Sequence, residues 1–331
     1  MDNEIMVTVA CITYNQKKYI RQCLESLVSQ KTNFDYEVIV HDDASTDGTT
    51  EIIREFEAKY PQIIKPIYQE KNQYSQGIPI NATYIAPKAR GKYTAFCEGD
   101  DYWCDSLKLQ KQVDVLENHP NCNLCLHTVR CINESGKKQK RTIPRFLPNT
   151  GLWDSRTFLE GFIKKYFFQI SSYLIRTDVL KNFYFDPPLF VQKANKAQIG
   201  DDSRLLYLGQ LGSVYYIKEE MSHYRVNAIG SWSIGQRSNT EKQFRHHTLM
   251  LEMLDEFNIY TNFLYDDLCQ YKKEYWHFRI ALIKKDKKEL KKKKYKIYFK
   301  TMSLKSRIYI WFDIHASWCT QLYKKLAYRK K

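Results

Sequence analysis

Three pairs of adjacent aspartates are the residues best suited to chemistry in this chain of 331 residues: Asp42-Asp43, Asp100-Asp101 and Asp201-Asp202. Like charges repel and burial penalises each of them, so neighbouring carboxylates need compensation in a folded protein. A divalent cation provides it, because hard cations take carboxylate oxygens and bridge them to phosphate groups. The alternative is that an acidic pair opens a helix, where it complements the helix dipole. The position of each pair in the fold must decide.

The apolar pattern predicts that the first two pairs follow strands of one parallel sheet. Apolar runs predict strands at residues 5–12, 36–40, 63–68 and 93–96, with amphipathic helices after the first two. Alternating strands and helices build a parallel sheet, and its functional loops gather at the carboxyl ends of the strands. We therefore expect Thr13-Tyr14-Asn15, Asp42-Asp43 and Asp100-Asp101 to lie together. No glycine-rich phosphate loop follows the first strand, which argues against dinucleotide-binding and P-loop proteins.

Several stretches, in order and spacing, resemble family 2 glycosyltransferases of the GT-A fold. They are Ile-Thr-Tyr-Asn at residues 12–15, Glu-Val-Ile-Val-His-Asp-Asp-Ala-Ser-Thr-Asp-Gly-Thr at residues 37–49, and Gly-Lys-Tyr-Thr-Ala-Phe-Cys-Glu-Gly-Asp-Asp-Tyr-Trp at residues 91–103. The similarity returns at Gly200-Asp201-Asp202 and Tyr224-Arg225. It implies an α/β fold, a Rossmann-like mostly parallel sheet flanked by helices, over residues 1–231. Residues 232–331 would form a basic helical C-terminal region.

The resemblance assigns the donor side of a nucleotide-sugar site. Asp43, with Asp42 beside it, would contact the nucleotide base, and the backbone around Thr13, Tyr14 and Asn15 would complete that pocket. Asp101 would bind a divalent metal, Mn²⁺ or Mg²⁺, and Asp100 would face the ribose or the sugar. For Asp43 the alternative is a turn residue that bonds the backbone.

The second half would supply the acceptor side. Asp202 matches the family's general base, with Asp201 as the fallback, although both acids also suit a helix start. Arg225 would contact phosphate or brace the acids. Relatives often have a histidine where Asn227 stands, which puts a third metal ligand from that loop in doubt. Residues 167–175 read as a strand that lines the cleft.

The net charge of +15 is concentrated after residue 272. Helices are predicted at residues 244–257, 260–283 and 304–328, and the last combines aromatic and basic residues. Such a helix suits an anionic membrane surface, a solvated face packed on the catalytic domain, or a homodimer contact. The N-terminus lacks a secretory signal and no apolar run reaches a membrane span, so we expect a cytoplasmic protein. The first of the three alternatives for the last helix would make it peripheral on the cytoplasmic face of the membrane.

These features predict a metal-dependent, inverting glycosyltransferase. It would move a sugar from a nucleoside diphosphate, UDP, to a glycan acceptor such as a lipid-linked oligosaccharide in bacterial surface polysaccharide synthesis. A nucleotidyltransferase is the second hypothesis, but it needs a phosphate loop where Thr13-Tyr14-Asn15-Gln16 stands. A nucleic-acid-binding protein ranks third, because the lysines lie in one tail and the carboxylates would repel phosphate.

Overall fold

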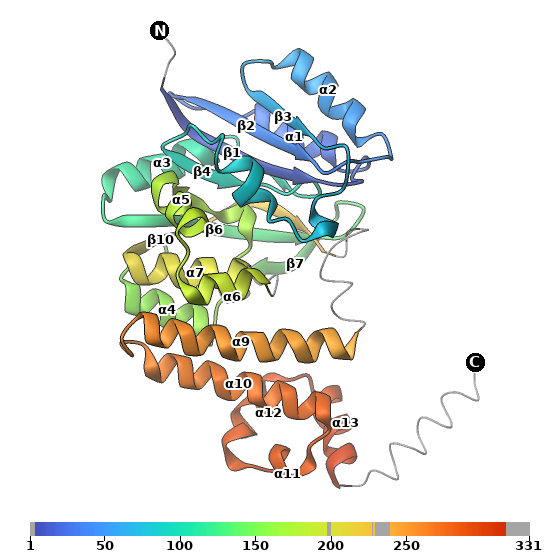
Figure 1. Ribbon diagram of the computed structural model, residues 1–331, viewed down its shortest axis with the longest axis vertical. Helices are drawn as coiled ribbons and strands as arrows, with labels where there is room; N and C mark the ends of the chain where they lie inside the picture. Colours follow the sequence, from blue (N-terminus) through green and yellow to red (C-terminus); the bar gives the residue numbers. More distant parts are fainter. Residues whose placement is uncertain (1–3, 197–199, 227, 229–238, 316–331) are drawn as a thin grey trace, which may run out of the picture. The chain divides into compact units, whose positions relative to one another are not determined.

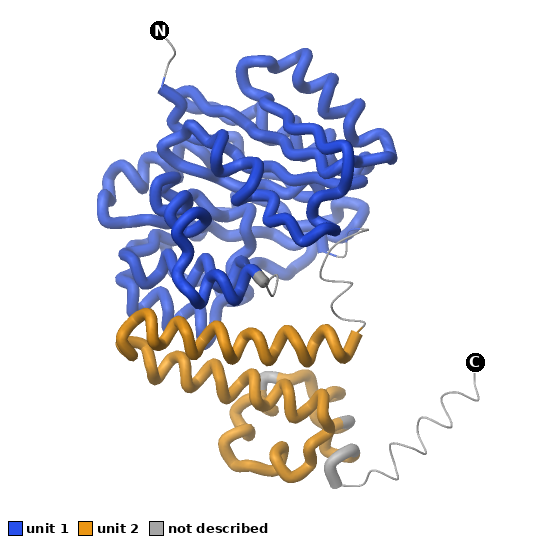
Figure 2. Tube along the Cα trace, viewed as in Figure 1, with its two compact units in different colours: residues 1–235 blue, residues 236–331 orange. Residues whose placement is uncertain are grey.

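The computed structural model describes residues 4–196, 200–226, 228 and 239–315. The chain divides into two compact units, Met1–Gly235 and Gln236–Lys331, which we describe separately (Figure 2). The boundary expected after residue 231 falls within residues 229–238, outside the described part of the chain, and stays a prediction.

The first unit is built on one sheet with the strand order β3-β2-β1-β4-β9-β6-β10-β5 (Figure 1). Strand β7 pairs with β6, and β8 pairs with β10. Strands β3, β2, β1 and β4 are parallel to one another. Strand β9 pairs antiparallel with both β4 and β6, and β6 pairs parallel with β10. The predicted α/β architecture is confirmed. The strands are β1 (Ile5–Thr13), β2 (Asp35–Asp42), β3 (Ile64–Tyr68), β4 (Tyr93–Phe96), β5 (Tyr102–Trp103), β6 (Cys122–Ile132), β7 (Lys138–Ile143), β8 (Gly151–Trp153), β9 (Leu174–Arg176) and β10 (Ser213–Arg225).

Helices cover both faces of this sheet. Val7, Val9 and Cys11 alternate along β1 and pack in one buried cluster with the apolar residues of α1, α2 and α3. Helix α5 and the short turn η2 lie against the opposite face of β1 and β4. The helical segments are α1 (Ile20–Val28), α2 (Thr49–Lys59), η1 (Tyr74–Gln76), η2 (Asn81–Ile85), α3 (Lys108–Asn118), α4 (Ser155–Lys164), η3 (Ile170–Ser172), α5 (Thr177–Phe185), α6 (Leu189–Lys196) and α7 (Gly200–Leu211).

The strand predicted over residues 167–175 is wrong. The structure has the 3-10 turn η3 followed by the short strand β9. Side chains hold the turn: the Gln169 amide oxygen accepts from the Ser171 backbone N–H at 2.7 Å, and Gln112 Nε2 donates to the Ser172 carbonyl at 2.9 Å. Such side-chain bonds offer the backbone an alternative to the sheet, and the apolar pattern does not reveal them.

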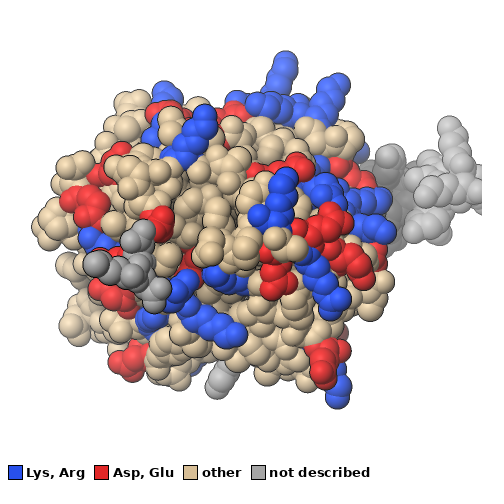
Figure 3. All heavy atoms as spheres, turned by 90° about the horizontal axis from the view of Figure 1, so that it is seen from above, with Lys and Arg blue, Asp and Glu red and all other residues tan. Residues whose placement is uncertain are grey.

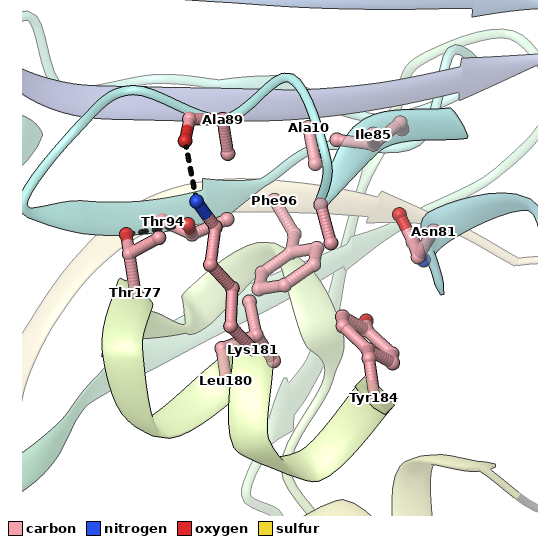
Figure 4. A pocket seen from close by; sticks show the side chains of 11 residues that line it. Ala10, Asn81, Ile85, Ala89, Thr94, Phe96, Thr177, Leu180, Lys181 and Tyr184 are labelled. Carbon is pink, nitrogen blue, oxygen red and sulfur yellow. Dashed lines mark hydrogen bonds between the residues drawn. The ribbon is translucent and has the colours of Figure 1, made fainter. Parts of the chain in front are cut away.

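A small cavity lies between β1, β4, η2 and α5 (Figure 4). Its lining is largely apolar, and its polar groups are paired in part: Lys181 Nζ donates to the Ala89 carbonyl at 3.0 Å, and the Thr94 and Thr177 hydroxyls lie 2.8 Å apart. The space inside it that a water-sized molecule could occupy is about 10 Å³, far below the ~300–1,000 Å³ typical of ligand pockets. We therefore assign it to packing between α5 and the sheet.

The second unit is helical around an aromatic core. Phe278, Tyr295 and Tyr298 are buried together with Ala281 and Leu290. The predicted helical extension is confirmed over the described residues, whereas residues 316–328 of the last predicted helix lie outside them. None of the described helices is both long and apolar enough to cross a bilayer. The elements are α9 (Thr240–Tyr260), α10 (Asp266–Lys284), α11 (Lys287–Leu290), η4 (Lys293–Tyr295), α12 (Lys296–Thr301) and α13 (Leu304–His315).

Candidate active site

The loops that follow β1 and β2 are tied together, as predicted for neighbouring parallel strands. The Asp43 backbone N–H donates to the Thr13 carbonyl at 3.0 Å. Asn15 adopts a φ of 50°, and its side-chain oxygen accepts from the Thr46 N–H at 2.8 Å. Asparagine tolerates this left-handed conformation better than most residues, which suits it to the turn. Tyr14 is left 46% exposed at the end of β1.

Asp42 and Asp43 are both 1% exposed and organise loops. Asp42 accepts from the Ser45 N–H at 3.1 Å and from the Thr50 hydroxyl. Asp43 accepts from the backbone N–H groups of Gln73 at 2.7 Å and Tyr74 at 3.0 Å. Asp43 therefore fixes the segment around η1 beside the β2 end, and its contact with a nucleotide base stays a prediction.

Gly99 allows the acidic loop after β4 to reach the end of β1. Its N–H donates to the Ile12 carbonyl at 3.0 Å. A Cβ atom at Gly99 would lie 2.4 Å from Gln16 Oε1 and 2.7 Å from Thr13 Oγ1, too close for any side chain without rearrangement. Because glycine permits this close approach, Glu98 and Asp100 lie beside the loops that follow β1 and β2.

Asp101 is 1% exposed, as enclosed as Asp42 and Asp43 and more so than its neighbour Asp100. Its Oδ1 accepts from the Arg225 backbone N–H at 2.8 Å, and its Oδ2 accepts from Gln169 Nε2 at 2.9 Å. Burial, followed by repulsion from Asp100 and Glu98, raises the pKa of Asp101 well above its ordinary value. Our sequence reasoning missed Gln169; the signal was a lone amide within the apolar residues 167–175.

The side chain of Arg225 holds the acidic loop in place through hydrogen bonds to backbone carbonyls and to Gln22. Its guanidinium Nε donates to the Asp100 carbonyl at 3.0 Å, its Nη1 donates to the Glu134 carbonyl at 2.8 Å, and its Nη2 donates to Gln22 Oε1 at 3.1 Å. The residue is 3% exposed. Of the two roles expected for Arg225, these contacts match bracing.

Glu98 and Asp100 form the acidic surface closest to solvent in this loop. Burial raises the pKa of Asp100, with Arg225 and Gln16 opposing the shift. The side chain of Glu98 is partly exposed, but protein atoms surround its carboxyl group. The loss of water around that group, followed by repulsion from Asp100 and Asp201, raises the pKa of Glu98 to about 8. Clustered carboxylates whose ionisation is disfavoured are a donor set that fits a hard divalent cation.

Helix α7 brings the third acidic pair to the same place. Asp201 and Asp202 lie in its first turn, and Asp201 is close enough to Glu98 to raise the pKa of that carboxyl group. Asp201 also pairs with Arg204, whose Nη1 lies 3.1 Å from Oδ1. Arg204 is 5% exposed, and sequence reasoning did not single it out. The choice between Asp202 and Asp201 as the base stays a prediction.

Cys104, Glu220 and His223 form a separate group whose ligand atoms lie within 4.8 Å of one another. Glu220 already pairs with Arg130 at 2.7 Å and Lys138 at 3.2 Å, so a cation would compete with two basic side chains. Asn227 lies outside the described residues.

The fold and the acidic edge define the class: a GT-A sheet with carboxylates at the carboxyl ends of its parallel strands. The profile described as Glycosyl transferase family 2 matches residues 8–183, more than half of the sequence. The chain belongs to glycosyltransferase family 2.

Curated relatives agree with this assignment. An uncharacterized protein of Mycobacterium bovis is 36% identical over 231 residues, which are 68% of this chain and 60% of that relative. The match thus spans less than two thirds of the relative's length. The putative teichuronic acid biosynthesis glycosyltransferase TuaG of Bacillus subtilis is 33% identical over 111 residues, 34% of this chain and 42% of TuaG.

Solved structures share the fold at low sequence identity. Residues 1–349 of S. aureus TarS in complex with UDP-GlcNAc superpose with a TM-score of 0.59 and 18% identity, over 94% of this chain and 79% of the other. The mannosyltransferase PcManGT from Pyrobaculum calidifontis, in complex with GDP-Man and Mn²⁺, gives a TM-score of 0.52 and 15% identity, over 85% and 74% of the two chains.

Proposed function

We propose that this chain is a metal-dependent, inverting glycosyltransferase that moves a sugar from a UDP-sugar to a glycan acceptor. The proposal rests on the acidic loop after β4, which carries Glu98 and Asp100 and is bonded through Gly99 to the end of β1, with Asp201 near enough to act on the charge of Glu98. Acids gathered at this edge of a parallel sheet, where ligands bind, match the needs of a cation and a sugar diphosphate.

The donor would lie across the ends of β1, β2 and β4. A carboxylate has about four acceptor sites, so the two backbone bonds to Asp43 leave capacity for the imide N–H of uracil. The half-exposed ring of Tyr14 offers an apolar surface beside the base. TarS was solved with UDP-GlcNAc and PcManGT with GDP-Man, so the choice of uridine rests on the Asp43 contact and is tested below.

The contacts favour Asp100, with Glu98, as the carboxylates that hold Mn²⁺ or Mg²⁺. Sequence reasoning placed the metal on Asp101, whose two oxygens each accept one protein hydrogen bond and keep acceptor capacity, as those of Asp43 do; Asp100, which is 9% exposed against 1% for Asp101, is the more accessible of the two. We propose that Asp101 positions the loop while Asp100 reaches the cation. When bound, such a cation supplies Lewis-acid neutralisation of the departing diphosphate.

The acids of α7 would serve the acceptor. Asp202, or Asp201 as the fallback, would take the proton of the acceptor hydroxyl as its oxygen attacks the anomeric carbon from the face opposite the diphosphate. Attack from that face inverts the centre. Arg204 pairs with Asp201, and the choice between Asp202 and Asp201 is left to the kinetics of the two Asp→Asn variants.

For the acceptor we propose a glycan of the bacterial cell surface, carried on lipid. The similarity to TuaG, named for teichuronic acid biosynthesis, supports a surface polysaccharide. We also propose that the chain works in the cytoplasm, where nucleotide sugars are made.

The first experiment is a thermal-shift screen of UDP, GDP, CDP and their common sugar conjugates, with Mn²⁺ or with a chelator. We expect UDP and one UDP-sugar to raise the melting temperature only when the metal is present. Release of UDP from that sugar, followed with a glycan acceptor by NMR of the product anomer, then measures transfer and stereochemistry.

Each part of the proposal has its own contrary result. Stronger stabilisation by GDP would overturn the assignment to uridine. Turnover that persists with a chelator would overturn metal dependence, and a retained anomer would overturn inversion. Failure of every nucleotide sugar to bind would overturn glycosyl transfer.

A further inference from the structure

Helix α13 presents an apolar stripe away from the core of its own unit. Leu304, Ile308 and Phe312 are four residues apart, so they lie along one side of the helix, and they are 68%, 49% and 38% exposed. Trp311 extends this side and is 54% exposed. We call these four residues the α13 stripe.

A different side of α13 holds the helix onto its unit. Ile310 packs against the cluster of Phe278, Tyr295 and Tyr298. The helix begins after Ser303, whose hydroxyl accepts from the Ser306 N–H at 3.2 Å, as an N-cap does. Because Ile310 fixes one side of α13 against its own unit, the α13 stripe faces outward. Most surface helices instead turn their apolar side inward.

Basic residues surround the α13 stripe. Lys305 and Arg307 are exposed and lie on either side of it at helical spacing. Residues 284–307 contain twelve Lys and Arg against two acids, Asp286 and Glu289. Lys291, Lys292, Lys293 and Lys294 are all exposed.

We propose that the α13 stripe docks this unit on an anionic membrane surface, with the helix lying in the plane of the headgroups. Large apolar side chains flanked by Lys and Arg are the composition of interfacial helices, and anionic lipid attracts the nearby positive charge. The 12 described residues of α13 span about 18 Å against the ~30 Å hydrocarbon core, and no helix in the described part of the chain is long and apolar enough to cross it.

Charge argues against two other occupants. Residues 236–331 carry 23 of the 52 Lys and Arg but 10 of the 37 Asp and Glu, a net charge of +13, so two copies meeting here would repel each other. Nucleic acid would satisfy the charge but gives no reason for an exposed row of leucine, isoleucine and tryptophan. The inference does not depend on the proposed sugar transfer.

The test is flotation of the full chain with vesicles of phosphatidylcholine alone or with 30% phosphatidylglycerol added. We expect binding to the anionic vesicles, weakened by salt, and at least about tenfold weaker binding for Ile308→Ser/Trp311→Ser. The charge variant Lys305→Glu/Arg307→Glu leaves every apolar residue in place and should also lose binding. Circular dichroism verifies that both variants keep their helices.

The chain offers a matched control in the turn between α9 and α10. Phe263 and Leu264 are 62% and 67% exposed, but the acids Asp266 and Asp267 follow them. Phe263→Ser/Leu264→Ser should leave vesicle binding unchanged. Equal losses in the control and in the α13 variants would overturn the proposal. So would vesicle binding that survives the α13 changes, or binding of random DNA or a dimer that depends on the α13 stripe.

Discussion

The two compact units handle charge in opposite ways. The first unit is close to neutral, with 29 basic and 27 acidic residues, and it buries carboxylates at one edge of its sheet. Both signs of charge are interspersed on the face drawn in Figure 3. The second unit carries a net charge of +13, and most of the lysines that the structure describes in it are exposed, around an aromatic core. Buried carboxylates that repel one another indicate a site for a ligand of opposite charge, whereas exposed lysines together attract anionic partners from a distance.

Lysine shows the contrast within one residue type. Lys108 is 0% exposed, lies 4.0 Å from the centre of the Trp103 ring, and donates to Gln112 Oε1 at 2.7 Å. Burial lowers the pKa of Lys108 to about 7. Gln112 in turn donates to the carbonyls of Cys125 and Ser172, so Lys108 supports the turn that carries Gln169 to Asp101. The exposed Lys291–Lys294 run has no comparable structural role.

The largest effect should come from Asp100→Asn. We expect kcat/KM to fall by more than about 100-fold, because an amide is a poor ligand for a hard cation. The metal-free protein should unfold at the same or a higher temperature, since the change removes a charge that burial disfavours. Steady-state kinetics and calorimetry measure both. Asp114→Asn, on the exposed side of α3, is the matched control. A large loss of stability without metal would contradict the ligand role.

Variants of Asp101 can show whether this residue binds the metal or only positions the acidic loop. Asp101→Asn should reduce activity by about 10–100-fold, because its new N–H₂ faces the N–H₂ of Gln169. The swap Asp101→Asn/Gln169→Glu restores a donor and an acceptor and should recover activity if Asp101 only positions the loop. Failure of the swap to rescue metal affinity, with the fold intact by circular dichroism, would return the metal to Asp101.

Lys108→Met should change how stability depends on pH. A lysine with a folded-state pKa near 7 and an ordinary value of 10.5 destabilises the folded state below pH 7, and stability rises as pH increases from 7 toward 10.5. Methionine removes that dependence. We expect the stability of the wild type relative to the variant to grow by about 1–3 kcal/mol between pH 7 and pH 9, measured by urea unfolding. A pH-independent difference would show that Lys108 stays charged or stays neutral throughout.

The smallest effect is expected in the second unit. Tyr295 is fully buried, and its hydroxyl donates to Glu289 Oε1 at 2.8 Å. Tyr295→Phe should reduce stability by about 1 kcal/mol, whereas Lys292→Ala, which removes an exposed ion pair to Glu289, should change it by less than ~0.5 kcal/mol. The melting temperatures of both variants, measured in low and in high salt, distinguish the buried hydrogen bond from the exposed ion pair, because salt weakens only the ion pair. A larger loss for Lys292 would mean that the lysine run does stabilise this unit.

Local patterns predicted most of the architecture. Strands β1 to β4 and helices α1 and α2 follow from apolar spacing, and their order predicts the parallel sheet and the meeting of its loops. The sequence showed that apolar, aromatic and basic residues are combined over residues 304–328, but it did not show which side of the helix packs inward, because that depends on which residue meets the aromatic core. Gln169 was missed because its partner Asp101 lies 68 positions away in sequence. Arg204 was missed although its partner Asp201 lies three residues before it, a spacing at which helical side chains meet.

The sequence alone determined that acidic pairs end strands of a parallel α/β sheet and that positive charge collects in the C-terminal region, because periodicity and composition are local properties. Only the tertiary structure showed which protein groups hold each acid. The bonds from Gln169 and from the Arg225 backbone to Asp101 join residues 68 and 124 positions apart. Such contacts depend on chain packing, which local patterns in the sequence do not reveal, and our proposal that Asp101 positions the loop builds on them.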